Sequence, residues 1–423
     1  MLTTLPNDED VVVNSDHLPG GPSGGHVFAN LTRPPVALND FGPYAFCSNH
    51  DILTCQTLSL IFHVCIPRTY PVMDAHEPTN VSQPNSSTSE VPQAVNNLTE
   101  EEASRYDRQM RLWGLEAQQR MRNATILVVR LKGTATEAIK NMVLAGIGKL
   151  VIVDNEKVAE EDLGAGFLFR DEDVGKKRLD AAKSRVESLN PLVTVETIPD
   201  ASVLQDDAFE VLVRTVDLVC VTDWDRDGLI RMNDVCRRIG KPFYAGGTYG
   251  LLGYIFCDLL SHDYIAPDRS AVKDAPKNVK KTAVYSPLRA AIRHRWSGLT
   301  KRQTKEVNPA VVFTILAIWQ YQSLHGGHLP DDDGAAAELH SIANSLITEA
   351  DVNKQVLTEA PKPLIDAIAT TAAYEFSPVC AIVGGMLAQD ILKALAAREP
   401  PIANFFAFDG NTGGGTVTRM NMP

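Results

Sequence analysis

Cysteine is sparse and unpaired in this sequence. The chain of 423 residues contains seven cysteines, and no two of them form a Cys-x-x-Cys pair. This spacing and the odd total argue against a zinc module and against a disulfide framework, and they predict a reduced intracellular protein without a metal site. The seven residues are Cys47, Cys55, Cys65, Cys220, Cys236, Cys257 and Cys380.

Excess positive charge and long apolar runs near the start are missing as well. Lys and Arg total 40 against 52 Asp and Glu, which gives a net charge of -12. This balance argues against general binding to nucleic acid or to an anionic membrane, and it favours a partner with a basic face. The apolar stretch at residues 57–66 has about half the length of a membrane helix. We therefore expect a soluble protein, and the length predicts about two to three domains.

A glycine-rich phosphate loop is the third absence. Residues 126–154 read ILVVRLKGTATEAIKNMVLAGIGKLVIVD, a strand, turn, helix and strand with the layout of a nucleotide-binding βαβ unit. The turn has Arg130, Lys132 and Ala135 around a single glycine, Gly133, where Gly-x-Gly-x-x-Gly would bring the backbone against a phosphate. We predict a degenerate, pseudo-nucleotide site that binds no cofactor in this chain.

Asp154 ends the second strand of this unit. In a dinucleotide-binding fold an acidic residue at this point binds a ribose hydroxyl. Without the glycine turn we expect Asp154 to be a relic of that role or the N-cap of a helix.

Composition divides the chain into four stretches. Residues 1–98 are rich in Pro, Asn, Ser, Thr and Gly, which predicts a disordered leader, although the more apolar patch at residues 47–65 does not fit this description. Residues 99–265 and 310–423 are predicted to be the two parts of the folded domain. Residues 266–309 are locally basic, and we expect a mobile loop there, with a nuclear-import signal as the alternative.

The folded part alternates apolar strands with helices. Thr99, followed by three glutamates, predicts a helix start. The alternation that follows predicts an α/β fold in which helices cover both faces of a parallel sheet. The expected strands are 126–129, 150–154 and 218–223, and the expected helices are 134–145, 175–189 and 226–239.

Residues 375–410 predict a long apolar helix, entered through Pro378, and then a strand. The pair Gly384 and Gly385 inside the helix costs about 1 kcal/mol per residue against Ala. Something must therefore approach this helix very closely. Either a partner chain packs on it, or it is a core helix of this chain, and both can hold.

Five phrases of the sequence resemble the small regulatory subunits of the SUMO-activating enzymes. They run in order from about residue 100 to the end: RYDRQMRLWG, the βαβ stretch above, GAGFLF, VGKKRLDAAKSRVESLNP and SPVCAIVGGMLAQDILKALAAREPPIANFFAFDG. The resemblance implies a Rossmann-like, doubly wound mixed sheet of the ThiF/MoeB adenylating-enzyme type. It also implies an obligate heterodimer in which this half is inactive and the catalytic subunit binds ATP and Mg²⁺.

The same resemblance assigns roles to single residues. It implies that Arg108 reaches across the heterodimer to the γ-phosphate of ATP, whereas the residues alone leave open an ion pair with Asp107 or Glu102. Asp223 matches the magnesium-binding Asp of a catalytic half and is expected to be inert. Residues 163–166 read Leu-Gly-Ala-Gly where the catalytic half has Asn-Arg-Gln. The thioester-forming cysteine is expected in the partner.

The implied function is activation of SUMO by adenylation of its C-terminal glycine, in the nucleus. One alternative is the matching subunit of the cullin-modifier (Nedd-type) activating enzyme, which is a longer chain with a large helical insertion. A stand-alone Rossmann oxidoreductase lacks support, because the glycine turn and a Tyr-x-x-x-Lys arrangement are missing. A binding-only scaffold is the last alternative.

Overall fold

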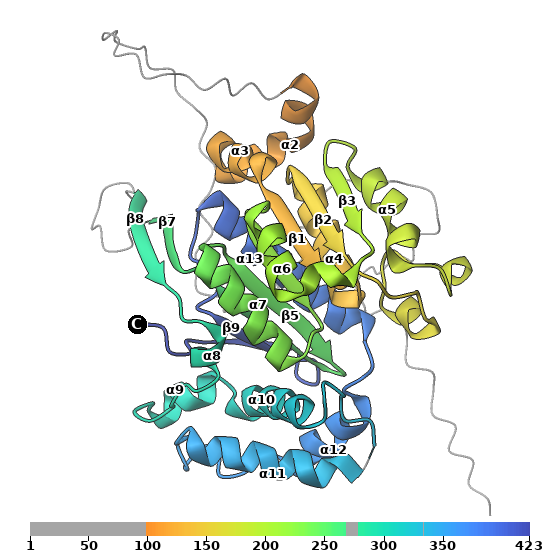
Figure 1. Cartoon of the computed structure of the whole chain (residues 1–423). Helices are drawn as coiled ribbons and strands as arrows, with labels where there is room; N and C mark the ends of the chain where they lie inside the picture. The colour runs from red at the N-terminus through yellow and green to blue at the C-terminus, as the bar shows by residue number, and fades with distance from the viewer. Residues whose placement is uncertain (1–98, 268–277, 333) are drawn as a thin grey trace, which may run out of the picture. The chain divides into compact units, whose positions relative to one another are not determined.

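This computed structural model describes residues 99–267, 278–332 and 334–423. These residues form a mixed sheet with helices packed on it (Figure 1). These residues belong to one unit of the chain, Thr57–Pro423. The predicted leader, residues 1–98, lies outside the described residues. The strands of the sheet are β1 (Thr125–Val129), β2 (Lys149–Val153), β3 (Thr194–Ile198), β4 (Leu218–Thr222), β5 (Phe243–Tyr249), β6 (Leu252–Asp258), β9 (Phe405–Asp409) and β10 (Gly414–Thr418).

The strand order is β10-β9-β6-β5-β4-β1-β2-β3. Strands β1 to β5 pair in parallel, and β6, β9 and β10 add antiparallel pairs on one side. The predicted strands at 126–129, 150–154 and 218–223 are confirmed to within one residue at each end. Strand β3 was not predicted, because it lies at the sheet edge and buries little more than Val195, so its sequence has no continuous apolar run.

Helices cover both faces of the sheet, as predicted for a doubly wound fold. Alternate residues of each central strand point to opposite faces, so Ile126 and Val128 join one hydrophobic cluster and Leu127 and Val129 join another. The first cluster contains residues of α4 (Gly133–Ala145), α5 (Arg178–Leu189) and α13 (Ser377–Ala396). The second contains residues of α6 (Asp206–Arg214), α7 (Arg226–Ile239), α10 (Pro309–Leu324), α11 (Gly334–Glu349) and α12 (Lys362–Thr371).

Two helices precede the sheet, α2 (Glu100–Trp113) and α3 (Leu115–Asn123). The predicted start at Thr99 is confirmed: its side chain accepts the amide of Glu102, and the Glu102 carboxylate accepts the amide of Thr99. Tyr106 of α2 accepts a hydrogen bond of 2.8 Å from Asn190, just before β3, and its ring leaves no room for a Cβ at Gly146, just before β2. Helix α2 therefore packs against the amino ends of the parallel strands.

The close neighbour of Gly384 in α13 is α4. A Cβ at Gly384 would lie 2.6 Å from the carbonyl oxygen of Thr134 and 2.7 Å from Cβ of Glu137. By length and composition α13 could cross a membrane, but much of it is buried against α4 and the sheet. The interpretation as a core helix is confirmed, and contact with a partner stays a prediction.

The expectation of a loop at residues 266–309 is wrong for much of the described segment. Strands β7 (Ser261–Pro267) and β8 (Asn278–Val284) form an antiparallel ribbon, and α8 (Leu288–Ala291) and α9 (Lys301–Glu306) follow. Cross-strand contacts hold the ribbon, since Asp263 pairs with Lys280 at 2.8 Å and accepts a hydrogen bond from Thr282. Basic side chains are compatible with strand pairing when a carboxylate lies on the neighbouring strand. Residues 268–277 lie outside the described part.

Candidate functional site

The crevice at the carboxyl ends of β1, β2 and β4 is where the sequence places the degenerate nucleotide site. Strand order reverses between β1 and β4, and α/β proteins bind their ligands at such a reversal. The turn from β1 leads through Arg130 and Lys132 directly into α4, which begins at Gly133. The predicted turn residues and both relic positions, Asp154 and Asp223, do border this crevice.

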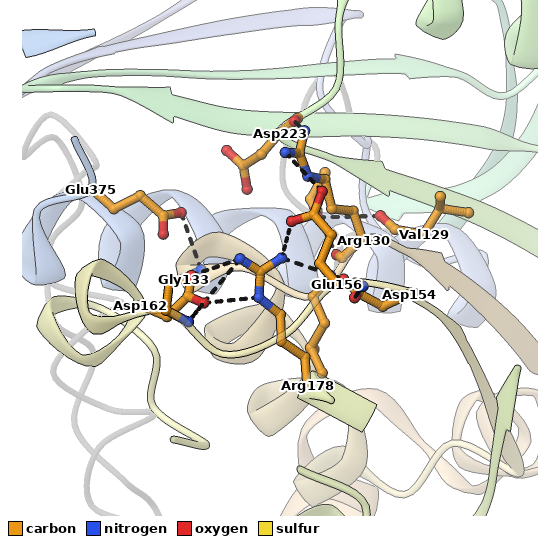
Figure 2. A network of polar contacts seen from close by, with 12 residues as sticks. Val129, Arg130, Gly133, Asp154, Glu156, Asp162, Arg178, Asp223 and Glu375 are labelled. Atoms are coloured by element: carbon orange, nitrogen blue, oxygen red, sulfur yellow. Dashed lines mark hydrogen bonds and ion pairs between the residues drawn. The ribbon is translucent and has the colours of Figure 1, made fainter. Parts of the chain in front are cut away.

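The first amide of α4 is occupied by a carboxylate of the same chain. The Gly133 N–H donates to Oε1 of Glu375 at 3.1 Å (Figure 2). A helix N-terminus favours an anion, and in a nucleotide-binding turn that anion is a phosphate. Burial, followed by the nearby charge of Asp223, raises the pKa of Glu375 to about 7. An internal carboxyl group therefore occupies the place where a phosphate would bind.

Side chains also fill the room that glycines would leave beyond Gly133. Ala135 is fully buried in the hydrophobic cluster beneath α4. The Thr136 hydroxyl donates to the carbonyl of Gly133 at 2.8 Å and accepts the amide of Phe167 at 3.1 Å. A ligand cannot approach the backbone here without displacing these groups.

Arg130 closes the crevice from the other side. It adopts a left-handed backbone conformation with φ of 70°, and its guanidinium donates to the carbonyl of Asp223 and lies over the Trp224 ring at 5.8 Å. Two cavities of about 360 and 310 Å³ flank it, one reaching Lys132 and the other reaching Asp154. Arg130 therefore divides a space that an intact nucleotide would need undivided.

Asp154 holds the turn together and caps no helix, so the N-cap interpretation is wrong. Its carboxylate is buried and accepts the amides of Leu131 and Glu156, each at 2.7 Å. Burial raises the pKa of Asp154, and these two amides oppose that rise. Both carboxylate oxygens therefore hold the backbone of the turn.

A buried ion-pair cluster around Arg178 lies beside Asp154, and the sequence did not predict it. The Arg178 guanidinium is 4% exposed and makes a bidentate pair with Asp162, both contacts at 2.9 Å (Figure 2). It also donates to Glu156 and lies 3.7 Å from Asp154. Asp162 belongs to the short helix η1 (Glu160–Gly164), so this cluster fixes the segment after β2 to the start of α5.

Asp223 is strained and only partly satisfied. Its φ is 50°, and its Oδ1 accepts the amide of Thr248 at 3.1 Å. Its Oδ2 is buried, and no hydrogen bond from a described residue reaches it. Burial raises the pKa of Asp223. Within the described ranges no group of three or more His, Cys, Asp and Glu side chains gathers as metal ligands would.

Arg108 lies on the exposed side of α2, away from the crevice. No hydrogen bond or ion pair joins it to another residue that the structure describes. The predicted alternative partners are taken, because Asp107 pairs with Arg111 at 3.0 Å and Glu102 pairs with Arg122 at 2.6 Å. Helix α2 packs at the amino ends of the strands and the crevice opens at their carboxyl ends, about 16 Å away along a five-residue strand.

Comparison with known proteins agrees with this fold. The ThiF family model matches residues 106–423. SUMO-activating enzyme subunit 1 of Rattus norvegicus is 35% identical over 76% of this chain and 95% of its own length. The Homo sapiens protein of the same name is 34% identical over 77% of this chain and 97% of its own length. The chain belongs to the ThiF family, in the group of SUMO-activating enzyme subunit 1.

Among solved structures, the ThiF-family chain is similar to the crystal structure of PaaA, with a TM-score of 0.49, 16% sequence identity and coverage of 76% of this chain and 84% of that chain. The family match begins at residue 106, so it includes Arg108, the crevice and α13.

The described cysteines of this ThiF-family chain are unsuited to nucleophilic chemistry. Cys220, Cys236, Cys257 and Cys380 are buried, and burial raises the pKa of Cys220 and of Cys380 to about 12. A thiol is reactive as its thiolate, so these residues are inert at neutral pH. The remaining three cysteines lie outside the described residues.

Proposed function

We propose that this chain is the regulatory subunit of a heterodimeric SUMO-activating enzyme and has no turnover alone. One observation carries the proposal: in its own crevice Glu375 occupies the first amide of α4 and Arg130 divides the remaining space, while Arg108 stands exposed and unpaired with described residues at the other end of the sheet. Relatives named SUMO-activating enzyme subunit 1, matched over 95–97% of their length, support the choice of modifier.

The proposed reaction takes place in the catalytic partner, which binds ATP and Mg²⁺. The C-terminal carboxylate of SUMO attacks the α-phosphorus of ATP, forming the acyl adenylate and releasing pyrophosphate. Negative charge grows on the leaving phosphates, and the Arg108 guanidinium from this chain neutralises it in trans. A permanently charged, planar fork suits phosphate oxygens. A partner cysteine then takes the acyl group as a thioester and releases AMP.

The surface next to Arg108 suits the catalytic partner. Leu112 near the end of α2 is 71% exposed, and Leu115 at the start of α3 and Leu144 near the end of α4 are also exposed. A cavity of about 280 Å³ beside Leu112 is lined also by residues of α4 and α13. Exposed apolar residues of this kind mark protein interfaces. Burying them would hold Arg108 at the partner's nucleotide, so the expected role of residues 375–410 is to form one wall of this surface.

The decisive experiment is ATP–pyrophosphate exchange with SUMO, measured for this chain alone, for the catalytic partner alone and for the mixture. The mixture with Arg108→Ala is compared with one carrying Arg111→Ala, since Arg111 is a neighbouring exposed arginine already paired with Asp107. We expect activity only in mixtures, and a roughly 10²–10³-fold loss for Arg108→Ala, as for other donors that stabilise transition-state charge. Arg111→Ala should retain activity.

Other outcomes would select the alternatives. Exchange by this chain alone would overturn the interpretation of a closed crevice. Full activity of the Arg108→Ala mixture would favour a non-catalytic scaffold. Exchange with the cullin modifier but not with SUMO would favour the Nedd-type enzyme.

We also propose a nuclear location, as the resemblance implies. The basic segment folds in part, since the Trp296 side chain is 2% exposed and packs on Phe313. It must therefore be tested in the folded chain as well as in a reporter fusion of residues 266–309. A fusion that stays in the cytoplasm, while the full chain enters the nucleus, would reject this segment as the import signal.

A further inference from the structure

A basic cavity lies apart from the crevice, among α7, α8, α10 and the end of α11. Its volume is about 800 Å³, within the range of sites that bind small molecules or peptide segments. Its lining includes Arg226, Arg289, Ile292, Arg293, Arg295 and Leu346, and the arginines outnumber the two carboxylates there, Glu349 and Asp227, the latter paired with Arg226. These residues come from segments far apart in the sequence, so the cavity exists only in the folded chain.

The positive charge of this cavity contrasts with the rest of the chain. The sequence has no Asp or Glu between Asp274 and Glu306, although the whole chain carries a net charge of -12. Part of this acid-free stretch, from α8 to Arg295, forms one wall of the cavity. A local excess of Arg in an acidic protein indicates an anionic ligand at that wall.

The basic wall is held in place by the core. The Trp296 amide donates to the carbonyl of Ala350 at 2.7 Å, and the Trp296 ring lies 5.2 Å from that of Phe313. His294 accepts the amide of Asn421 at 3.2 Å. Arg293 and Arg295 therefore project from a fixed backbone, which lowers the entropy cost of binding a ligand.

Two of the arginines are occupied and two are available. Arg226 bonds Asp227, Gln320 and Ser323, and Arg289 pairs with Asp234 at 2.7 Å. Arg293 and Arg295 are exposed and make no ion pair with any described residue. These two guanidiniums can each make bidentate hydrogen bonds to a carboxylate without breaking an existing contact.

We propose that this cavity binds an acidic peptide segment of a partner protein, with carboxylates on Arg293 and Arg295 and an apolar side chain against Ile292 and Leu346. The latter two are half-buried, so they offer the apolar surface that a lone oxyanion would not use. The cavity is also far larger than a single oxyanion, and the acidic chain repels nucleic acid. This inference does not rest on the proposed function.

Fluorescence anisotropy with the full chain tests whether the cavity binds an acidic peptide. The probe is a short labelled peptide of glutamates around a central leucine, and its matched control has glutamine at each glutamate. We expect the acidic peptide to bind, the glutamine peptide not to bind, and added salt to weaken binding because the contacts are exposed. In Arg293→Glu/Arg295→Glu the dissociation constant should rise at least about tenfold, as for other charge pairs turned repulsive.

Arg302→Glu is the control, because Arg302 is basic, 89% exposed and lies on α9 outside the cavity lining. Arg293→Gln/Arg295→Gln, with unfolding followed in parallel, separates lost binding from misfolding. Equal binding by the double variants, or no binding of the acidic peptide, would overturn the proposal. If inorganic phosphate at the same concentration displaced the peptide, the cavity would be a simple oxyanion site, and the proposal would be rejected. If single-stranded DNA bound more tightly than the peptide, the ligand would be a nucleic acid, and the proposal would be rejected as well.

Discussion

At the scale of single residues, one carboxyl group explains why the first amide of α4 is not available to a phosphate. Glu375 lies 242 residues beyond Gly133 in the sequence, yet it accepts the first amide of α4. The helix N-terminus stabilises negative charge whether a phosphate or a carboxylate carries it. The chain therefore keeps the physical chemistry of a nucleotide turn and uses it for an internal contact.

Burial of Glu375, with the charge of Asp223 nearby, should make folding stability depend on pH. The pKa of Glu375 rises from its ordinary value of 4.5 to about 7 in the folded state, so the folded chain holds this proton more tightly than the unfolded chain. The contribution to stability is full below pH 4.5 and falls as pH rises toward 7. Glu375→Gln keeps an acceptor for the Gly133 amide and cannot ionise. The free energy of unfolding of this variant should therefore fall less between pH 4.5 and 7 than that of the wild type.

Urea unfolding at a series of pH values, for the wild type, Glu375→Gln and the exposed control Glu160→Gln, checks this. If the wild type and Glu375→Gln show the same pH slope, the buried carboxyl does not titrate as described.

The sequence predicted some site residues and missed others for a physical reason. The turn residues 130–135 were predictable, because glycines must sit at fixed spacing to admit a phosphate. Glu375, Asp162 and Arg178 were not, since each acts through a partner distant in sequence, 16 residues away for Asp162 and Arg178. No local sequence pattern predicts a contact between residues so far apart in the chain. Asp154 was placed correctly and its role was not, because the groups that donate to its carboxylate are backbone amides, which no residue type reveals.

At the scale of elements, the packing of α13 on α4 determines the shape of the crevice. Gly384 lets the two helices approach so closely that Thr134 and Glu137 occupy the place of a Cβ. Helix α13 follows Glu375 directly, so the same packing also delivers that carboxylate to Gly133. The glycine that weakens the isolated helix thus positions the group that closes the site.

Gly384→Ala should therefore destabilise the chain although Ala is the better helix former. Ala favours a helix interior by about 1 kcal/mol over Gly. The clash with α4 should outweigh this and give a net loss of about 1–3 kcal/mol, as for other overpacked cores. Denaturant unfolding measures the change, with Gly164→Ala as control, since nothing lies within 4 Å of a Cβ there. A Gly384→Ala protein as stable as the wild type would show that the helices can separate without cost.

At the scale of the described unit, the two ends of the parallel strands have different characters. The carboxyl end carries a crevice closed by Glu375 and Arg130, and the amino end carries α2 with exposed Leu112 and Arg108. This separation supports the proposal that Arg108 acts on a nucleotide held by a partner chain.

The interface proposal predicts that Leu112→Asp/Leu115→Asp weakens binding to the catalytic partner while this chain stays folded. Both side chains are exposed, so their replacement should leave the stability of this chain within about 0.5 kcal/mol. Loss of an apolar anchor at the centre of an interface costs about 2 kcal/mol or more. Sedimentation of the mixed subunits measures it, with Val211→Asp on α6 as an equally exposed control. Unchanged association would place the partner elsewhere.

The sequence by itself determined the alternation of strands and helices, the capped start at Thr99, the loss of the glycine turn and the family. These features follow from local periodicity, capping and spacing, which neighbouring residues carry. Only the tertiary structure decided that Glu375 takes the place of a phosphate, that α4 is the close neighbour of Gly384, and that Arg108 and the crevice lie at opposite ends of the strands. Each of these depends on segments far apart in the chain, whose meeting is fixed by the packing of the whole core.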